Sequence, residues 1–192
     1  MSKPRVGGAA GEVRLIGGRW KRSKLPVADK PGLRPTPDRV RETLFNWLGQ
    51  DLAGWRCFDA FAGTGALGFE AASRGAAEVL LVEQDSVLVD QLKRIQIQLQ
   101  ASNIQVRRGD ALALLAQQEP LSLDLVFLDP PITADLFESS LRSAARTLKS
   151  DGFVYLEAPV AWNELQLEPL GLVLYRYLKA GAVHAHLLQR IA

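Results

Sequence analysis

The chain has 192 residues, of which 47% are hydrophobic and 23% are charged, and its formal net charge is +2. This length corresponds to one domain, and this composition excludes a wholly disordered chain. No apolar run approaches the roughly 20 residues that span a bilayer, and the N-terminal segment lacks the apolar core of a secretory signal. A single cysteine excludes an internal disulfide, and with only two histidines it argues against a structural zinc site. We therefore expect a cytoplasmic, monomeric protein with no membrane segment and no metal.

The charge is distributed unevenly along the chain. Residues 1–42 contain eleven lysines and arginines against four acidic residues, a net +7, whereas the other 150 residues contain twelve against seventeen, a net −5. A basic segment on an acidic body is typical of proteins that bind a polyanion, because neutralising phosphates provides affinity for any sequence. Strand-like and turn-like positions follow one another from Val13 to Leu25, and Trp20 is an aromatic suited to base stacking. We expect a basic, hairpin-like, RNA-contacting extension over residues 1–35 and a catalytic domain over residues 36–192; a solubilising tail is the alternative.

The elements expected after this extension alternate between strand and helix. Three prolines between residues 30 and 37 predict an extended connector, and Thr36 and Pro37 then predict a helix start as N-cap and first helical residue. Apolar runs bounded by glycines alternate with helical periodicity, and two final strands flank Gly181 with no helix between them. This order predicts an α/β three-layer sandwich with a doubly wound, mostly parallel sheet of about seven strands and an antiparallel last strand. The expected strands are 56–61, 79–82, 104–106, 123–128, 153–157, 173–177 and 183–189, and the expected helices after the first are 67–73, 86–101, 112–117 and 134–148.

A glycine-rich turn follows the first strand of the alternating region. Gly63–Gly68 satisfies the pattern G-x-G-x-x-G, and Glu83 ends the next strand 20 residues after Gly63. This spacing is typical of dinucleotide sites, in which the acidic residue binds ribose hydroxyls. Asp59, at the end of the first strand, favours S-adenosylmethionine instead, because a carboxylate repels a pyrophosphate but can bind the ammonium of a methionine moiety. Taken alone, the glycine motif leaves a nicotinamide cofactor as the alternative.

Two further carboxylates are expected at the same edge of the sheet. Asp110 opens a helix after the third strand, where it can cap that helix and also accept a hydrogen bond from an adenine amino group. Asp129-Pro130-Pro131 ends an all-apolar strand, and the two prolines exclude a helix and stiffen the loop. The Asp129 carboxylate and the Pro130 carbonyl can accept both N–H groups of an exocyclic base amine, which directs the nitrogen lone pair toward a sulfonium methyl group. The motif therefore indicates methyl transfer to a base amine, without distinguishing guanine N2 from adenine N6.

Five stretches of the sequence resemble the bacterial RsmD family of class I S-adenosylmethionine-dependent methyltransferases. They are RLIGGRWKRSKL (14–25), GLRPTPDRVRETLFNWL (32–48), DAFAGTGALGFEAASR (59–74), LVEQD (81–85) and FLDPP (127–131). The resemblance implies methylation of the exocyclic N2 of a specific guanine in 16S rRNA, within an assembled or nearly assembled 30S subunit. It also implies that residues 34–36 lie near the cofactor and the RNA. RsmD-like proteins usually carry an aromatic residue where this chain has Ile132. An adenine-N6 methyltransferase acting on DNA or RNA, and a non-catalytic RNA-binding protein, remain as alternatives.

These considerations assign three sets of candidate residues. The catalytic set is the loop Asp129, Pro130 and Pro131. The cofactor-binding set lies at the carboxyl ends of the strands and comprises Asp59, Phe61, Gly63, Thr64, Gly65, Glu83, Asp110 and Ala111. The RNA-binding set consists of cations near the N-terminus and comprises Arg14, Arg19, Lys21, Arg22, Lys24, Arg34, Arg39 and Arg41.

Overall fold

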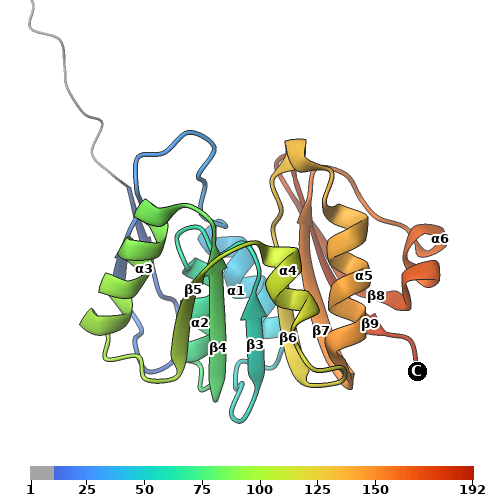
Figure 1. The fold of residues 1–192 in the computed structure, drawn as a ribbon, viewed down its shortest axis with the longest axis horizontal. Coiled ribbons are helices and arrows are strands. Elements are labelled where there is room, and N and C mark those ends of the chain that lie inside the picture. Colours follow the sequence, from blue (N-terminus) through green and yellow to red (C-terminus); the bar gives the residue numbers. More distant parts are fainter. Residues whose placement is uncertain (1–10) are drawn as a thin grey trace, which may run out of the picture.

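A seven-stranded sheet with helices on both faces forms the body of the protein in the computed structural model, which describes residues 11–192 (Figure 1). The strand order is β5-β4-β3-β6-β7-β9-β8, and the last strand, β9, runs antiparallel to both of its neighbours. The neighbouring strands from β5 to β7 pair in parallel. The predicted fold class is therefore confirmed. The part of the predicted extension before residue 11, with its cations Lys3 and Arg5, lies outside the described residues.

The elements follow the predicted alternation closely. The strands are β1 (Glu12–Arg14), β2 (Lys24–Pro26), β3 (Arg56–Asp59), β4 (Glu78–Glu83), β5 (Ile104–Arg108), β6 (Leu123–Leu128), β7 (Leu148–Ala158), β8 (Leu172–Ala180) and β9 (Val183–Arg190). The helices are α1 (Asp38–Trp47), α2 (Ala66–Ser73), α3 (Ser86–Gln98), α4 (Ala111–Ala116), α5 (Phe137–Thr147) and α6 (Glu164–Leu167), with short 3-10 turns η1 (Ile132–Ala134) and η2 (Glu168–Leu170). Across residues 11–192, no helix is both long enough and apolar enough to cross a membrane.

The central strand β6 shows why the sheet forms. Its residues 125–128 are fully buried, because helices cover both faces of a parallel sheet and such strands read as continuous apolar runs. Phe127 belongs to the core on one face, with Phe45 of α1, whereas Val126 belongs to the core on the other face, with Leu141 of α5. Each such side chain contributes about 1.5–3 kcal/mol through burial. The two cores hold β6 rigidly, and its carboxyl end carries Asp129.

The described part of the predicted extension is a two-stranded hairpin that packs on the domain. β1 pairs antiparallel with β2, and Val13, Leu15 and Leu25 are buried in the same core as α1 and α2. Trp20 is only 8% exposed in this core. The expectation that Trp20 stacks on a base is therefore wrong, because its ring fills an apolar contact within the protein.

The connector between β2 and α1 ends differently from the prediction. Helix α1 begins at Asp38, and Pro37 is the N-cap without a side-chain capping hydrogen bond. Thr36 does not cap the helix: its hydroxyl donates to Glu157 Oε1 at 2.6 Å, 121 residues away in the chain. The partner of Thr36 is thus the buried carboxylate of Glu157, near the end of β7, and not the backbone N–H groups at the start of α1 that the local sequence predicted.

Candidate active site at the carboxyl edge of the sheet

The glycine turn between β3 and α2 has a backbone that side chains would disturb. Gly63 and Gly65 have φ of 54° and 80°, in the left-handed region that favours glycine. A Cβ on Gly68 would overlap Leu81 of β4 and would lie 3.1 Å from Asp59 Oδ2. Thr64 is buried, and its hydroxyl accepts from Ala66 N at 3.3 Å. The turn therefore depends on glycine for its backbone conformation at Gly63 and Gly65 and for the close packing of α2 on β4 at Gly68.

Glu83 and Asp110 hold the loops on either side of this turn. Glu83 Oε2 accepts from Gly63 N at 2.9 Å, and Oε1 accepts from the backbone of Gln84 at 2.9 Å. Asp110 caps α4 by accepting from Ala113 N at 2.8 Å, and its other oxygen accepts from the Gln84 side chain at 3.1 Å. The predicted capping role of Asp110 is confirmed. Both carboxylates thus lie at the edge where a nucleoside can meet them.

Asp59 is the most buried acidic residue of this turn, with 3% of its surface exposed. Burial raises its pKa from the ordinary 3.8 to about 7, and the charges of Glu83 and Glu157 add to this rise. The hydrogen bond from Gly68 N to Asp59 Oδ2, at 3.0 Å, acts in the opposite direction. Within residues 11–192 the second oxygen, Oδ1, has no hydrogen-bond partner. This carboxyl is therefore suited to a cationic ligand group, which would favour its ionised form.

Asp129 follows β6 and faces two other acidic groups. Burial raises its pKa well above the ordinary value, and the charges of Glu157 and Asp59 raise it further. Glu157 accepts from Thr36 and, at 2.8 Å, from the Tyr155 hydroxyl, yet burial still raises the pKa of its carboxyl. Sequence reasoning missed Glu157, although its place at the end of an apolar strand was a usable signal.

The proline loop leaves one carbonyl free. The Pro131 carbonyl accepts from Ala134 N at 3.2 Å, whereas the Pro130 carbonyl and the Asp129 carboxylate accept no hydrogen bond from residues 11–192. Pro130 is buried, and Ile132 beside it is 69% exposed. The loop therefore offers a carboxylate and a carbonyl as a pair of acceptors at the sheet edge.

The donor set of this edge fits S-adenosylmethionine. Asp59 has a free oxygen for an ammonium, the turn from Gly63 to Gly65 allows close approach, and Glu83 retains acceptor capacity for ribose hydroxyls. Three raised carboxyl pKa values mark a site whose carboxylates would repel a polyphosphate and favour a cation. Phe61, two residues after β3, is half-buried, and Ala111, the first residue of α4, is buried.

The prediction that Arg41 contacts RNA is wrong. Arg41 is fully buried on the inner face of α1, where its guanidinium donates to Glu70 at 3.4 Å and to the Arg14 carbonyl at 3.0 Å. Its ion pair with Asp38 completes this environment. A phosphate cannot reach this guanidinium, because α1 packs it against the core. The other predicted cations are exposed: Arg14, Arg19, Lys21, Arg22, Lys24, Arg34 and Arg39.

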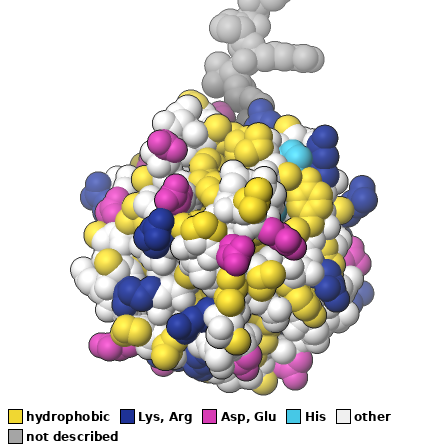
Figure 2. All heavy atoms as spheres, turned by 90° about the vertical axis from the view of Figure 1, so that its right-hand side faces the viewer, with side chains coloured by type: hydrophobic (Ala, Val, Ile, Leu, Met, Phe, Trp, Pro, Cys, Tyr) yellow, Lys and Arg dark blue, Asp and Glu magenta, His cyan; other side chains and the backbone are white. Residues whose placement is uncertain are grey.

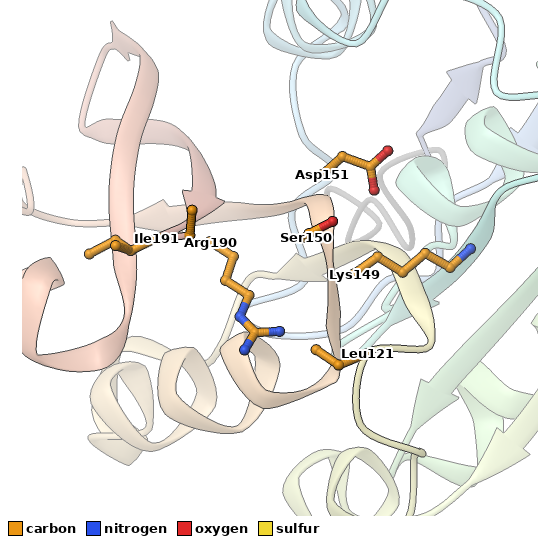
Figure 3. A pocket seen from close by; sticks show the side chains of 7 residues that line it. Leu121, Lys149, Ser150, Asp151, Arg190 and Ile191 are labelled. Carbon is orange, nitrogen blue, oxygen red and sulfur yellow. The ribbon is translucent and has the colours of Figure 1, made fainter.

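A pocket of about 470 Å³ lies at the other edge of the sheet (Figure 3). Lys149, Ser150 and Asp151 line it from the start of β7, and Arg190 lines it from the end of the antiparallel β9. Lys149 is paired with Asp124 at 3.0 Å. This pocket lies at the start of β7, whereas Glu157 lies near the end of the same strand. The pocket is therefore remote from the carboxylates described above. The chemistry of the residues, rather than the depth of a cavity, therefore identifies the candidate site.

Comparison with known proteins agrees with this geometry. The family described as Conserved hypothetical protein 95 matches residues 13–189. The chain is 43% identical over 194 residues to ribosomal RNA small subunit methyltransferase D of Escherichia coli (strain K12), covering 100% of this chain and 96% of the relative. It belongs to the RsmD family. The protein of the same name from Haemophilus influenzae is 42% identical, with 92% of this chain and 98% of the relative covered.

The fold of this RsmD-family chain is also that of its solved relatives. The structure of yhhF from Escherichia coli superposes with a TM-score of 0.80 at 36% identity, covering 94% of this chain and 99% of the other. The predicted family is thus confirmed, and the chain is a methyltransferase with a class I, Rossmann-like fold. The carboxyl edge described above is where this fold presents its site residues.

Proposed function

We propose that this RsmD-family chain transfers a methyl group from S-adenosylmethionine to the exocyclic N2 of a guanine in 16S rRNA of the 30S subunit. The observation that carries the proposal is the pair of free acceptors, the Asp129 carboxylate and the Pro130 carbonyl, at the edge that also holds Asp59. The names of the Escherichia coli and Haemophilus influenzae relatives support a ribosomal RNA substrate. A ribosomal substrate implies action in the cytoplasm, and we propose that the enzyme acts as a monomer.

The catalytic loop acts mainly by positioning. When bound, S-adenosylmethionine supplies an electrophilic methyl group on a cationic sulfur. Asp129 and Pro130 accept the two N–H groups of the base amine, so that the nitrogen lone pair is directed at the methyl carbon. Asp129 then accepts the proton that the methylated nitrogen releases, a task for which its raised pKa suits it. Pro131 stiffens the loop through its ring, and its carbonyl is not a free acceptor, because it is already bonded to Ala134 N.

The neighbouring residues hold the two substrates. Asp59 binds the ammonium of the methionine moiety, Glu83 binds the ribose hydroxyls, and Asp110 and Ala111 lie beside the adenine. The exposed cations bind RNA phosphates: Arg14, Arg19, Lys21, Arg22, Lys24, Arg34 and Arg39.

Transfer of a tritiated methyl group from S-adenosylmethionine tests the proposal. The acceptors are 30S particles, protein-free 16S rRNA and double-stranded DNA, and the product is digested to nucleosides and identified by mass spectrometry. We expect N2-methylguanosine from the ribosomal acceptors, and its rate of formation should be far lower with Asp129→Ala. N6-methyladenosine would support the adenine alternative, and RNA binding without transfer to any acceptor would support a non-catalytic protein.

A further inference from the structure

The C-terminal half of α2 holds the turn of the N-terminal hairpin. Glu70 has no exposed surface, and its carboxylate accepts from Ile16 N at 3.0 Å and from Gly17 N at 2.9 Å. The same carboxylate accepts from two guanidinium groups, those of Arg41 and Arg74, at 3.4 and 2.9 Å. A buried carboxylate with four donors is fixed in place, and it fixes the backbone bound to it.

Ser73 adds a second attachment one turn further along α2. Its hydroxyl accepts from Trp20 N at 2.9 Å and donates to the Gly17 carbonyl at 2.7 Å, and its own carbonyl accepts from Arg19 N at 2.7 Å. Gly18 has φ of 75°, and a Cβ there would overlap the Ser73 carbonyl. We call Glu70 and Ser73 the hairpin seat, because together they form hydrogen bonds with the backbone of Ile16, Gly17, Arg19 and Trp20 of the hairpin.

The hairpin seat binds Gly17, Arg19 and Trp20 of residues 17–23, which we call the basic turn, and this turn lies far from the catalytic loop. α2 begins at the glycine turn on the carboxyl edge and runs back along the sheet, and its eight residues span about 12 Å. The basic turn contacts the last of these residues and therefore lies toward the amino edge, as the deep-blue segment in the lower part of Figure 1 shows. Within residues 11–192 the exposed side chains of Arg19, Lys21 and Arg22 form no ion pair.

The surface at the β8 end of the sheet is of a different character. The face over β8, α5 and α6 carries hydrophobic side chains interspersed with charges of both signs (Figure 2). Its cations include Arg176, which lies over the Tyr175 ring at 4.2 Å, and Lys179. The backbone of the basic turn is thus fixed on one side of the molecule, and it carries a group of like charges.

We propose that the enzyme holds its RNA at two separate places: the target base at the carboxyl edge, and the phosphates of a duplex segment at the basic turn. Glu70 and Ser73 are the positioning residues of the second contact. This inference rests on the proposed function for its RNA substrate, and it narrows that substrate to folded RNA. A duplex presents phosphates at fixed spacing and so suits cations carried on a fixed backbone, whereas a flexible strand must lose conformational entropy to present its phosphates in the same way.

The variant Arg19→Glu/Lys21→Glu tests the second contact, with Arg176→Glu/Lys179→Glu as the control of equal charge. Binding of protein-free 16S rRNA and of a short single-stranded oligonucleotide is measured over a range of salt, and methyl transfer is measured on 30S particles. We expect the slope of log affinity against log salt for 16S rRNA to become shallower by about 2, one for each lost phosphate contact. The oligonucleotide affinity, the cofactor affinity and kcat at saturating particle stay as in wild type, while KM for the particle rises. The control changes none of these.

Ser73→Ala tests the hairpin seat without removing a charge. Hydrogen exchange at the amides of Arg19 and Trp20 is expected to accelerate, with the same selective rise of KM for the particle. For Arg19→Glu/Lys21→Glu, an unchanged salt slope, or an equal loss of affinity for 16S rRNA and for the oligonucleotide, overturns the inference. A defect on 30S particles without one on protein-free rRNA also overturns it, since the partner would then be a protein. These binding measurements hold even if no methyl is transferred, an outcome that refutes the proposed function alone.

Discussion

Asp59 is expected to make cofactor binding depend on pH. Its pKa is about 7 in the protein, because burial and the charges of Glu83 and Glu157 disfavour the carboxylate. The ammonium of the cofactor needs that carboxylate, so binding must release the proton that part of the population carries. Below pH 7 a larger fraction of the Asp59 carboxyl is protonated, so the affinity for the cofactor falls.

The magnitude follows from the ionised fraction of Asp59. For a pKa of about 7, this fraction falls about 25-fold between about pH 7.5 and pH 5.5, a range below the usual pKa of an α-amino group. The affinity for S-adenosylhomocysteine, which keeps the ammonium, should fall by the same factor. At pH 7 about half a proton is released for each molecule bound.

Isothermal titration calorimetry in buffers of different ionisation enthalpy measures both quantities. Asp59→Asn is the control: its affinity should be weaker and nearly independent of pH over this range. A wild-type affinity that stays constant from about pH 5.5 to 7.5, with no proton released, would refute the assignment of Asp59 to the ammonium.

The same carboxyl affects stability without the cofactor. Because the folded pKa of Asp59 lies above its ordinary 3.8, the protonated form stabilises the fold. This stability is complete below about pH 3.8 and is lost as pH rises through about 7, and it amounts to about 4 kcal/mol. The melting temperature of the free protein should therefore fall across this window, and saturating cofactor should reduce the fall.

Three other substitutions have defined outcomes. Gly68→Ala should lower the free energy of unfolding by about 1–3 kcal/mol in urea titrations, because the added methyl overlaps a leucine of β4; an unchanged midpoint would contradict the close approach. Glu70→Ala should cost about 3–5 kcal/mol by leaving the buried Arg74 guanidinium without its carboxylate partner, whereas Glu78→Ala, which removes an exposed ion pair, should cost less than about 1 kcal/mol; similar losses would argue against the hairpin seat. Glu157→Gln removes one of the charges that raise the pKa of Asp129, so the acidic limb of the kcat profile should shift to lower pH; a shift to higher pH would contradict this coupling.

The strands and the catalytic edge could be predicted because their signals are local. Residues 123–128 form one apolar run followed at once by Asp129, and the structure has β6 over the same residues. Asp59 and Glu83 end short apolar segments, and parallel strands bring such ends to one edge. Hydrophobic pattern and chain order were sufficient for these positions.

Contacts between distant segments could not be predicted in this way. Arg41 was expected at the surface because it stands among cations, yet its partner Glu70 is 29 residues away and both are buried. Thr36 satisfies the local pattern of an N-cap, but its hydroxyl reaches Glu157 across 121 residues. Trp20 likewise stands among exposed cations and packs inward. In each case the residue type suited two environments, and the tertiary packing decided between them.

Turnover and cofactor affinity of Asp129→Ala, measured side by side on 30S particles, test the central role of the sheet-edge carboxylate most directly. Since the substitution removes one of two acceptors for the base amine, kcat should fall by about 10²–10³-fold, the usual effect of removing one such preorganised hydrogen bond. The dissociation constant of S-adenosylhomocysteine should stay within about twofold of wild type, because Asp59 and the glycine turn remain intact. Nearly normal turnover, or an equal loss of turnover and cofactor affinity, would contradict the assignment of Asp129 to the reacting amine.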